Sequence, residues 1–431
     1  MASPAADAAP SAAPAGSAGA SSTRLRIIHF NDVYDVTDAP RFVHAVKALA
    51  APAGADPPAL VLFSGDCYSP SIMSVVTHGS QMPPVLGLCG VRAACFGNHE
   101  FDWGLARCEE LCAQCDFPWI MSNADWKATG APLGNGVRSV VLEHAGLRVG
   151  LMGLIEREWL ATLSTIAEDE VAWEDYVPAA RRIAAELRAD GADVVIALTH
   201  MRQPNDERLA AEVPALDLIL GGHDHDFYHL PVEGPRRVLV CKSGTDFREM
   251  SEVSLLVASE GGGGGEGGGG GGGGGGVRVE SARRVAVPKD GPADAEAASI
   301  VAEFECLVGQ EMEMEIGRTD VALDARFATI RSSESNVSNF VADILRAGTG
   351  AQLALVNAGT LRADRVLGPG SLSMRDLVSL LPMVGAPADC TRNTRRTHTH
   401  THALAPQTNQ RGAPSFSPRC FHMGATARQS N

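Results

Sequence analysis

Polar residues of the metal-ligand type follow several short apolar segments of this sequence. They are Asp32 after LRIIHF, Asp66 after ALVLFSG, Asn98 and His99 after AACFG, His200 at the end of DVVIALTH, and His223 and His225 after LDLILGG. A single Asp after a strand usually caps the next helix. A whole set at successive strand ends, on the same edge of a sheet, would instead converge in one cleft.

This combination of residue types indicates a chemistry. Two carboxylates, an amide oxygen and several imidazoles suit a pair of divalent cations. If two ions lie about 3.5–4 Å apart, one carboxylate can bridge them, and so can a hydroxide formed at neutral pH. Such a centre is suited to in-line attack on a phosphoester. The residues therefore predict a site for two divalent metal ions, with Mn, Zn, Mg and Fe all compatible.

The elements that must position these residues alternate along the chain. Apolar runs of strand length recur between residues 25 and 259, separated by turns and by segments of helical period. Clear helical candidates are residues 39–51, 104–115 and 175–191. Strands that alternate with helices predict an α/β domain in which helices cover a sheet.

Five sequence blocks then carry a family resemblance. HFNDVYDV, SGDCYSPS, FGNHEFDWG, ALTHM and GGHDH resemble, in order and spacing, the blocks of the calcineurin-like metallophosphoesterases. GNHEFDWG is similar to the 5′-nucleotidase branch of that family. The resemblance covers about residues 25–257 and implies a four-layer β-sandwich flanked by helices.

The resemblance also implies a role for each residue. Asp32 and His225 would bind the first metal, Asp66 would bridge both, and Asn98, His200 and His223 would bind the second. His99 would lie beside the phosphoryl group, where it stabilises the transition state or protonates the leaving oxygen, and Asp102 would orient it. One position departs from the family pattern, because Tyr34 stands where the family usually has a metal-binding His. A neutral phenol is the weaker ligand, so we expect a looser first site.

The second half of the chain resembles the 5′-nucleotidase C-terminal domain, through residues 330–346 and 354–385. The resemblance implies substrate contacts by Arg331, Asn357 and Arg362. Met383 replaces an aromatic residue that commonly stacks on the base, and the rest of the domain is missing, so we expect a partial second α/β domain. A nucleoside 5′-monophosphate is the first substrate expected. Another small phosphoester, a cyclic diester, a nucleotide-sugar pyrophosphate and a metal-stabilised binding protein stay open as alternatives.

Composition sets the expected domains. We expect a disordered leader over residues 1–23, a catalytic domain over 24–290 with a poly-Gly loop at 261–276, a linker helix over 291–315, a partial substrate domain over 316–385 and a low-complexity tail over 386–431.

Charge and composition also limit the partners. The chain has 431 residues and a net charge of −15; the last 41 residues hold six Arg and no acid, so the first 390 carry 30 − 51 = −21. Such an acidic protein repels nucleic acids and anionic membranes. No apolar run reaches the roughly 18 residues that a membrane span needs, and residues 1–22 lack the features of a secretory signal. We therefore expect a cytoplasmic protein whose partner is a small phosphoester, with no nucleic acid and no membrane as a partner; the sequence does not assign an oligomeric state.

Overall fold

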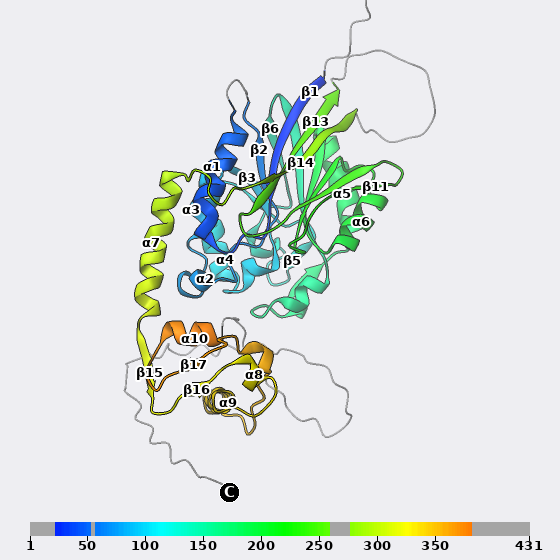
Figure 1. Ribbon diagram of the computed structural model, residues 1–431. Helices are drawn as coiled ribbons and strands as arrows, with labels where there is room; N and C mark the ends of the chain where they lie inside the picture. The colour runs from blue at the N-terminus through cyan, green and yellow to red at the C-terminus, as the bar shows by residue number, and fades with distance from the viewer. Residues whose placement is uncertain (1–21, 53–56, 259–275, 382–431) are drawn as a thin grey trace, which may run out of the picture.

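Two facing β-sheets form the centre of the catalytic part of the chain (Figure 1). The computed structural model describes residues 22–52, 57–258 and 276–381. Residues 1–21 of the expected leader, most of the poly-Gly tract, Met383 and the expected tail lie outside the described residues. The expected end of the leader at residue 23 was wrong, because Ser22 and Thr23 already pair within a β-strand. Within them, sheets flanked by helices confirm the predicted mixed α/β fold.

The first sheet has six strands in the order β14-β13-β1-β2-β3-β4. Its strands are β1 (Ser22–Phe30), β2 (Leu60–Phe63), β3 (Val91–Cys95), β4 (Trp119–Ile120), β13 (Glu249–Ala258) and β14 (Val277–Ala286). The strands from β1 to β4 run parallel, whereas β13 and β14 are antiparallel additions at one edge. The carboxyl ends of β1, β2 and β3 therefore meet at one end of the sheet.

The second sheet also has six strands, in the order β11-β12-β10-β9-β7-β6. Its strands are β6 (Ser139–His144), β7 (Leu147–Ile155), β9 (Val194–His200), β10 (Leu218–Gly222), β11 (Phe227–Val232) and β12 (Val238–Ser243). The four inner strands are parallel, and β6 and β11 are antiparallel edges. A separate short pair joins β5 (Ala124–Trp126) to β8 (Val171–Trp173).

Side-chain alternation along the strands explains the layers. In β1, Leu25 and Ile27 face the core between the two sheets, whereas Ile28 and Phe30 face the helices on the outer side. Successive side chains of a strand point to opposite faces, so a strand that is apolar on both faces must be covered on both. This is why the sequence shows continuous apolar runs here.

Helices cover the outer face of each sheet and complete four layers. The helices of the catalytic part are α1 (Ala39–Ala50), α2 (Ile72–Thr77), α3 (Met82–Leu88), α4 (Leu105–Cys112), α5 (Tyr176–Ala189) and α6 (Gln203–Glu212). Helices α1, α3 and α4 share a core with the first sheet, and α5 and α6 share one with the second. Short 3₁₀ turns are η1 (Val36–Asp38), η2 (Asn98–Phe101), η3 (Leu133–Asn135), η4 (Glu158–Thr162), η5 (Glu168–Glu170) and η6 (Ala358–Thr360).

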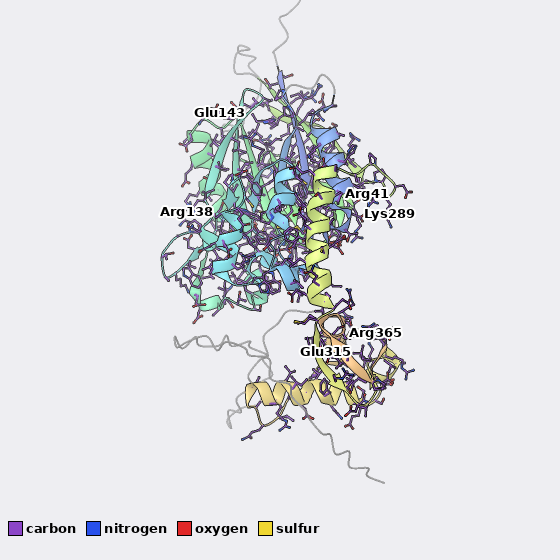
Figure 2. The ribbon with its side chains drawn as sticks, turned by 90° about the vertical axis from the view of Figure 1, so that its left-hand side faces the viewer. Arg41, Arg138, Glu143, Lys289, Glu315 and Arg365 are labelled. Atoms are coloured by element: carbon purple, nitrogen blue, oxygen red, sulfur yellow. The ribbon has the colours of Figure 1, made fainter. Side chains whose placement is uncertain are left out.

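Helix α7 (Ala295–Met312) leads from the catalytic part to the second domain (Figure 2). The Asp294 side chain caps its first turn by accepting from the Ala297 N–H, and Asp294 also pairs with Lys47 at 2.7 Å. The helix packs along α1, α2 and α3. It lies within the segment that we expected to be a linker helix.

The second domain is a small α/β unit with its own core. Its elements are β15 (Glu315–Thr319), β16 (Leu323–Asp324), α8 (Phe327–Ile330), α9 (Asn336–Thr349), β17 (Val366–Leu367), β18 (Gly370–Ser373) and α10 (Met374–Leu380). Strand β15 pairs with β18 and β16 with β17, both antiparallel. Its described core is limited to a few residues around Leu323, Val337 and Leu361.

Candidate metal centre

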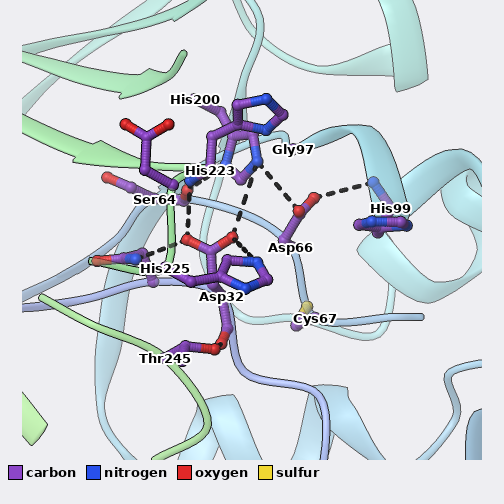
Figure 3. Close-up of polar contacts among 12 residues, drawn as sticks. Asp32, Ser64, Asp66, Cys67, Gly97, His99, His200, His223, His225 and Thr245 are labelled. Atoms are coloured by element: carbon purple, nitrogen blue, oxygen red, sulfur yellow. Dashed lines mark hydrogen bonds and ion pairs between the residues drawn. The ribbon is translucent and has the colours of Figure 1, made fainter. Parts of the chain in front are cut away.

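The ligand-type residues predicted from the sequence meet where the strand ends of both sheets come together (Figure 3). Asp32 and Asp66 follow β1 and β2 of the first sheet, and Asn98 begins η2 after β3. His200 ends β9 of the second sheet, and His223 follows β10. The expectation that all of them share one sheet edge was wrong. Parallel strands in both sheets point toward the same end of the sandwich, so two sheets contribute to one site.

One half of this centre consists of Asn98, His200 and His223 together with Asp66, and we call it the second half-site. Single ligand atoms of Asp66, His200 and His223 lie within 4.8 Å of one another. His200 Nδ1 lies 2.8 Å from the Ser64 carbonyl oxygen. If Nδ1–H donates to that oxygen, the ring is fixed with Nε2 facing the site, as in many metal-binding histidines.

Among the described residues, two buried atoms of the second half-site make no well-directed hydrogen bond, Asn98 Oδ1 and His200 Nε2, although His200 Nε2 has a charged neighbour. His200 Nε2 lies 3.1 Å from Asp66 Oδ2. Burial alone would lower the pKa of His200, but the Asp66 charge raises that pKa to about 10. The ring therefore carries a proton at neutral pH when no metal ion is bound. Buried polar atoms are normally paired. A metal ion would satisfy both atoms, and the residues of this half fit one.

The other half consists of Asp32, Tyr34 and His225 together with Asp66, and we call it the first half-site. Asp32 Oδ2 accepts hydrogen bonds from Asn31 Nδ2 at 2.6 Å and from the His223 N–H at 2.9 Å. Asp32 Oδ1 therefore faces the site, where His225 Nε2 lies 3.3 Å away.

Tyr34 reaches into this first half-site. Its Oη lies 2.8 Å from His225 Nε2 and 3.1 Å from both Asp32 Oδ1 and Asp66 Oδ2. Burial, followed by the charges of Asp66 and Asp32, raises the pKa of Tyr34 well above its ordinary value. Without a metal the phenol keeps its proton and donates to a carboxylate.

Asp66 lies between the two halves. Its Oδ1 accepts from the His99 N–H at 2.9 Å, and its Oδ2 faces both Tyr34 and His200. Burial would raise the pKa of Asp66, but the neighbouring His200 and His99 hold that pKa well below its ordinary value. The carboxylate therefore stays ionised in a buried position and is placed where a bridging ligand would be.

The backbone around the centre is strained. Asp32, Asp66, His223 and His225 have φ angles of 54°, 66°, 88° and 61°. Positive φ costs a residue with a Cβ about 1–3 kcal/mol and is retained mainly at functional sites. Glycines let the loops approach: a Cβ on Gly97 would lie 2.1 Å from Asp66 Oδ1, and one on Gly222 would lie 2.8 Å from His200 Nδ1.

His99 lies beside the first half-site, with its ring centroid 5.9 Å from that of Tyr34. Its Nδ1 is 2.7 Å from Asp102 Oδ2, which leaves Nε2 available. Burial would lower the pKa of His99, but the Asp66 charge and the Asp102 hydrogen bond raise that pKa to about 9. This is the pairing with Asp102 that the sequence led us to expect.

Two supporting residues escaped the sequence analysis. Glu100 is fully buried, and its carboxylate accepts from the N–H groups of Asp66 at 2.9 Å, Cys67 at 2.7 Å and Gly97 at 2.5 Å. Its signal was its place inside the GNHEFD block. A carboxylate with three such donors fixes the loop that carries Asp66.

Lys242 is the other missed residue, and it is also fully buried. Its Nζ donates to the Met201 carbonyl at 2.5 Å, pairs with Asp224, and lies 3.1 Å from Asp206 Oδ2. Asp224 stands between His223 and His225, so this cation anchors the loop that supplies one ligand to each half-site. Its signal was a Lys in the apolar strand VLVCKS.

The expected substrate residues lie in the second domain with exposed side chains. The Arg331 guanidinium stacks 4.0 Å above the Phe327 ring, and Asn357 Oδ1 accepts from the Gly359 N–H at 2.8 Å. The Arg362 N–H donates to the Leu380 carbonyl at 2.9 Å. Across residues 22–52, 57–258 and 276–381, no hydrogen bond joins these side chains to the metal centre, so their role stays a prediction.

Comparison with known proteins agrees with the site. Residues 25–227 match the family "Calcineurin-like phosphoesterase", and residues 315–387 match "5′-nucleotidase, C-terminal domain". The trifunctional nucleotide phosphoesterase of Bacillus subtilis is 23% identical over 83% of this chain, and the 5′-nucleotidase of Mus musculus is 24% identical over 85%. The aligned regions span 26% and 69% of those two proteins.

A solved structure shows the same fold. The NAD nucleotidase of Haemophilus influenzae matches 84% of this chain and 75% of its own, with a TM-score of 0.65 at 15% sequence identity. These matches confirm the two expected family domains, the expected fold and the expected enzyme class, a phosphoester hydrolase. Separately, none of the helices in the described parts of the chain is long and apolar enough to cross a membrane.

Proposed function

We propose that this chain, which carries the catalytic domain of the calcineurin-like phosphoesterases, hydrolyses phosphomonoesters with two divalent metal ions, and that nucleoside 5′-monophosphates are its substrates. The observation that carries the proposal is the place of Asp66. Its carboxylate lies between two sets of ligand-type atoms; in one of them His200 Nε2 is 3.1 Å from Asp66 Oδ2, and Asn98 Oδ1 has no hydrogen-bond partner among the described residues. The products would be a nucleoside and inorganic phosphate.

The metal ions would supply Lewis acidity and lower the pKa of water. The chain's own residues do the rest. Asp66 holds both half-sites at a fixed separation, and Ser64 and Glu100 hold the rings and loops that surround it. Because these groups are preorganised, they need not rearrange when charge develops on the phosphoryl group.

His99 is proposed to act on the substrate directly. The contact between Nδ1 and Asp102 leaves Nε2 free to donate a hydrogen bond or a proton toward a leaving oxygen. Asp102 keeps the ring oriented and favours its protonated form. General acid catalysis of this kind contributes about 10²–10⁴-fold to a rate.

Nucleotide specificity is proposed for the second domain. The mouse relative is named a 5′-nucleotidase, and residues 315–387 match the C-terminal domain of that family. Arg331 and Arg362 carry guanidinium groups suited to phosphate oxygens, and Asn357 has an amide suited to a base or sugar. The cytoplasmic location expected from the sequence also stays a proposal.

A broader substrate range is the second candidate. The Bacillus relative is named a trifunctional nucleotide phosphoesterase and the Haemophilus structure a NAD nucleotidase. A chain of this type could therefore cleave a cyclic diester or a pyrophosphate as well as a monoester. The same catalytic residues would serve, and only the leaving group would differ.

The test is a hydrolysis assay on the full chain loaded with Mn²⁺ or Zn²⁺, in which inorganic phosphate is measured and the nucleoside and nucleotide products are separated by chromatography. Its substrates are nucleoside 5′-monophosphates, a 2′,3′-cyclic nucleotide, a dinucleotide pyrophosphate and a sugar phosphate. Release from the monophosphates that His99→Gln reduces by about 10²-fold or more supports the proposal. His44→Gln, on helix α1, is the matched control and should retain activity. A metal-loaded chain that cleaves none of the esters contradicts it and favours the metal-stabilised binding protein.

A further inference from the structure

We propose that His29 is a positioning residue of the metal centre, which acts through Ser64 to fix the direction of the His200 ring. The inference deepens the proposed function and rests on it for the location of the second half-site. His29 belongs to a layer of buried polar side chains that lies between the two sheets, next to the metal centre.

This polar layer interrupts an apolar core. Ile27 of β1 lies in the core between the two sheets, and the alternation of side chains along a strand places His29 on the same face. Three serines continue the alternation of neighbouring strands in the same way: Ser64 after β2, Ser243 in β12 and Ser251 in β13. All four polar residues are buried. Burying a polar side chain costs free energy unless hydrogen bonds compensate for the loss of water.

His29 is held at both of its ring nitrogens. Its Nδ1 lies 2.7 Å from Ser243 Oγ, and its Nε2 lies 2.9 Å from Ser64 Oγ. Burial lowers the pKa of His29 to about 3, so the ring is neutral and one nitrogen carries a proton. Ser64 Oγ donates its own proton to the Leu220 carbonyl at 2.7 Å, an atom that can only accept. Ser64 Oγ therefore accepts from His29, and the proton lies on Nε2.

The hydrogen bonds of this layer join the two sheets. His29 and Ser251 belong to the first sheet, whereas Ser243 and Leu220 belong to the second. Ser243 Oγ lies 2.8 Å from Ser251 Oγ. Apolar contacts between sheets have no preferred direction, whereas hydrogen bonds fix both a distance and an angle. The layer therefore fixes one sheet relative to the other at the end where both supply ligand-type residues.

Ser64 connects the polar layer to the metal centre. Its carbonyl oxygen lies 2.8 Å from His200 Nδ1, and its N–H donates to the Phe30 carbonyl at 3.1 Å. Because its hydroxyl is also held, between His29 Nε2 and the Leu220 carbonyl, the residue that orients the His200 ring is restrained at three points. Partners that orient a metal-binding imidazole typically contribute about 10–100-fold to metal affinity.

A proton relay is the alternative interpretation of this network. It would begin at the partly exposed His229, whose Nε2 lies 2.9 Å from Ser251 Oγ. The network ends, however, at the Leu220 carbonyl, which cannot take up a proton and pass it on. Within the part of the chain that the structure describes, no hydrogen bond joins Ser64 Oγ to a ligand-type side chain. The network can therefore orient the centre but cannot deliver protons to it.

The test measures the affinity of the full chain for Zn²⁺ by isothermal titration, and the second half-site is identified as the one that His200→Asn weakens. His29→Leu should lower this affinity about 10–100-fold. His29→Gln should retain most of it, because its amide nitrogen takes the place of Nε2. His29→Asn, whose amide nitrogen takes the place of Nδ1, should not. Ser122→Ala is the control, because this buried hydroxyl also joins the two sheets, through the Arg138 carbonyl and the Gly153 N–H.

A second variant separates positioning from a general loss of structure. Ser64→Ala keeps the carbonyl that faces His200 but removes the anchored hydroxyl. It should lower Zn²⁺ affinity by a similar factor in the wild-type chain and in His225→Asn. In His200→Asn the ligand atom is already gone, so the further loss should be less than about twofold. Denaturation of the metal-free chain measures the folding of each variant. Because Ser64→Ala removes a single oxygen, it carries the test even if His29→Leu does not fold.

Three results would overturn the inference: a Ser64→Ala loss that is equally large in His200→Asn, a His29→Gln loss as large as that of His29→Leu, or a change in stability without a change in metal affinity. Because the readout is metal affinity and not turnover, the two proposals fail separately. A chain that shows the coupling but cleaves no ester contradicts only the proposed function, and an active chain without the coupling contradicts only this inference.

Discussion

The two half-sites of the metal centre differ in how firmly their ligands are held. In the second half-site, His200 is fully buried and its ring is fixed by the Ser64 carbonyl. In the first half-site, 49% of the His225 side chain is exposed, and Tyr34 Oη contacts Asp32 and Asp66. Asp66 belongs to both halves.

This difference teaches how one centre can combine a rigid and an adjustable set of ligand-type residues. The rigid half has its geometry set by the strand ends of β9 and β10 and by buried donors. The adjustable half takes the more exposed His225 from the loop that Lys242 anchors, which also carries His223 of the other half. Substitutions should therefore separate into those that affect both halves and those that affect one.

Asp66→Asn should have the largest effect, because it removes the charge that both halves share. We expect phosphate release to fall about a thousandfold, equivalent to about 4 kcal/mol. Asn retains an oxygen that can accept from the His99 N–H, so the fold should survive. The measurement is initial rate on a nucleoside 5′-monophosphate, with the exposed Asp116→Asn as control. A residual rate within tenfold of wild type would show that Asp66 is not shared.

Lys242→Met should weaken both halves through the fold. It leaves the carboxylates of Asp206 and Asp224 without their buried cation, and breaking one partner of a buried pair costs about 3–5 kcal/mol. The measurement is chemical denaturation of the metal-free chain, compared with the exposed Lys289→Met. An unchanged free energy of unfolding would mean that the cation does not anchor the loop.

His200→Asn and His225→Asn should separate the halves. We expect metal affinity to fall about a hundredfold for the buried His200 and about tenfold for the exposed His225, because water can replace an exposed ligand more readily. Isothermal titration with Zn²⁺ measures both, and His44→Asn is the control. Equal losses would remove the distinction between a rigid and an adjustable half.

Glu100→Gln should have an effect about as small as that of His225→Asn, at the low end of the series. The carboxylate accepts from three backbone N–H groups, whereas an amide presents only one acceptor oxygen. Loss of such a supporting partner typically costs about 10–100-fold in metal affinity, and we expect the lower end. The control is Glu110→Gln, an exposed residue paired with Arg107. A metal affinity equal to that of the control would show that the loop keeps its conformation without the Glu100 carboxylate.

Much of the fold could be read from local patterns. The apolar runs at residues 25–30, 148–155 and 193–200 predicted β1, β7 and β9, because strands covered on both faces are continuously apolar. Strands β6 and β11 were missed because they are half-buried edges whose pattern is mixed. The division into two sheets was also missed by residue patterns, since strand pairing is a long-range property; only the family resemblance supplied it.

The sequence predicted the ligand-type residues of the site, but not the buried charged residues that hold their loops in place. Asp32, Asp66 and His200 stand out because polar residues directly follow apolar strands. Glu100 and Lys242 do not stand out, because a buried charge looks like any surface charge until its partners are known. The contact of Tyr34 Oη with His225 Nε2 likewise joins chain segments more than 190 residues apart.

The most direct test of the account is phosphate release from adenosine 5′-monophosphate before and after metal removal. The full chain is assayed as purified, after dialysis against EDTA, and after Mn²⁺ or Zn²⁺ is restored, with bound metal counted at each stage. The account predicts that activity disappears with the metal and returns when two ions are bound per chain. Activity that persists in the metal-free chain would contradict it.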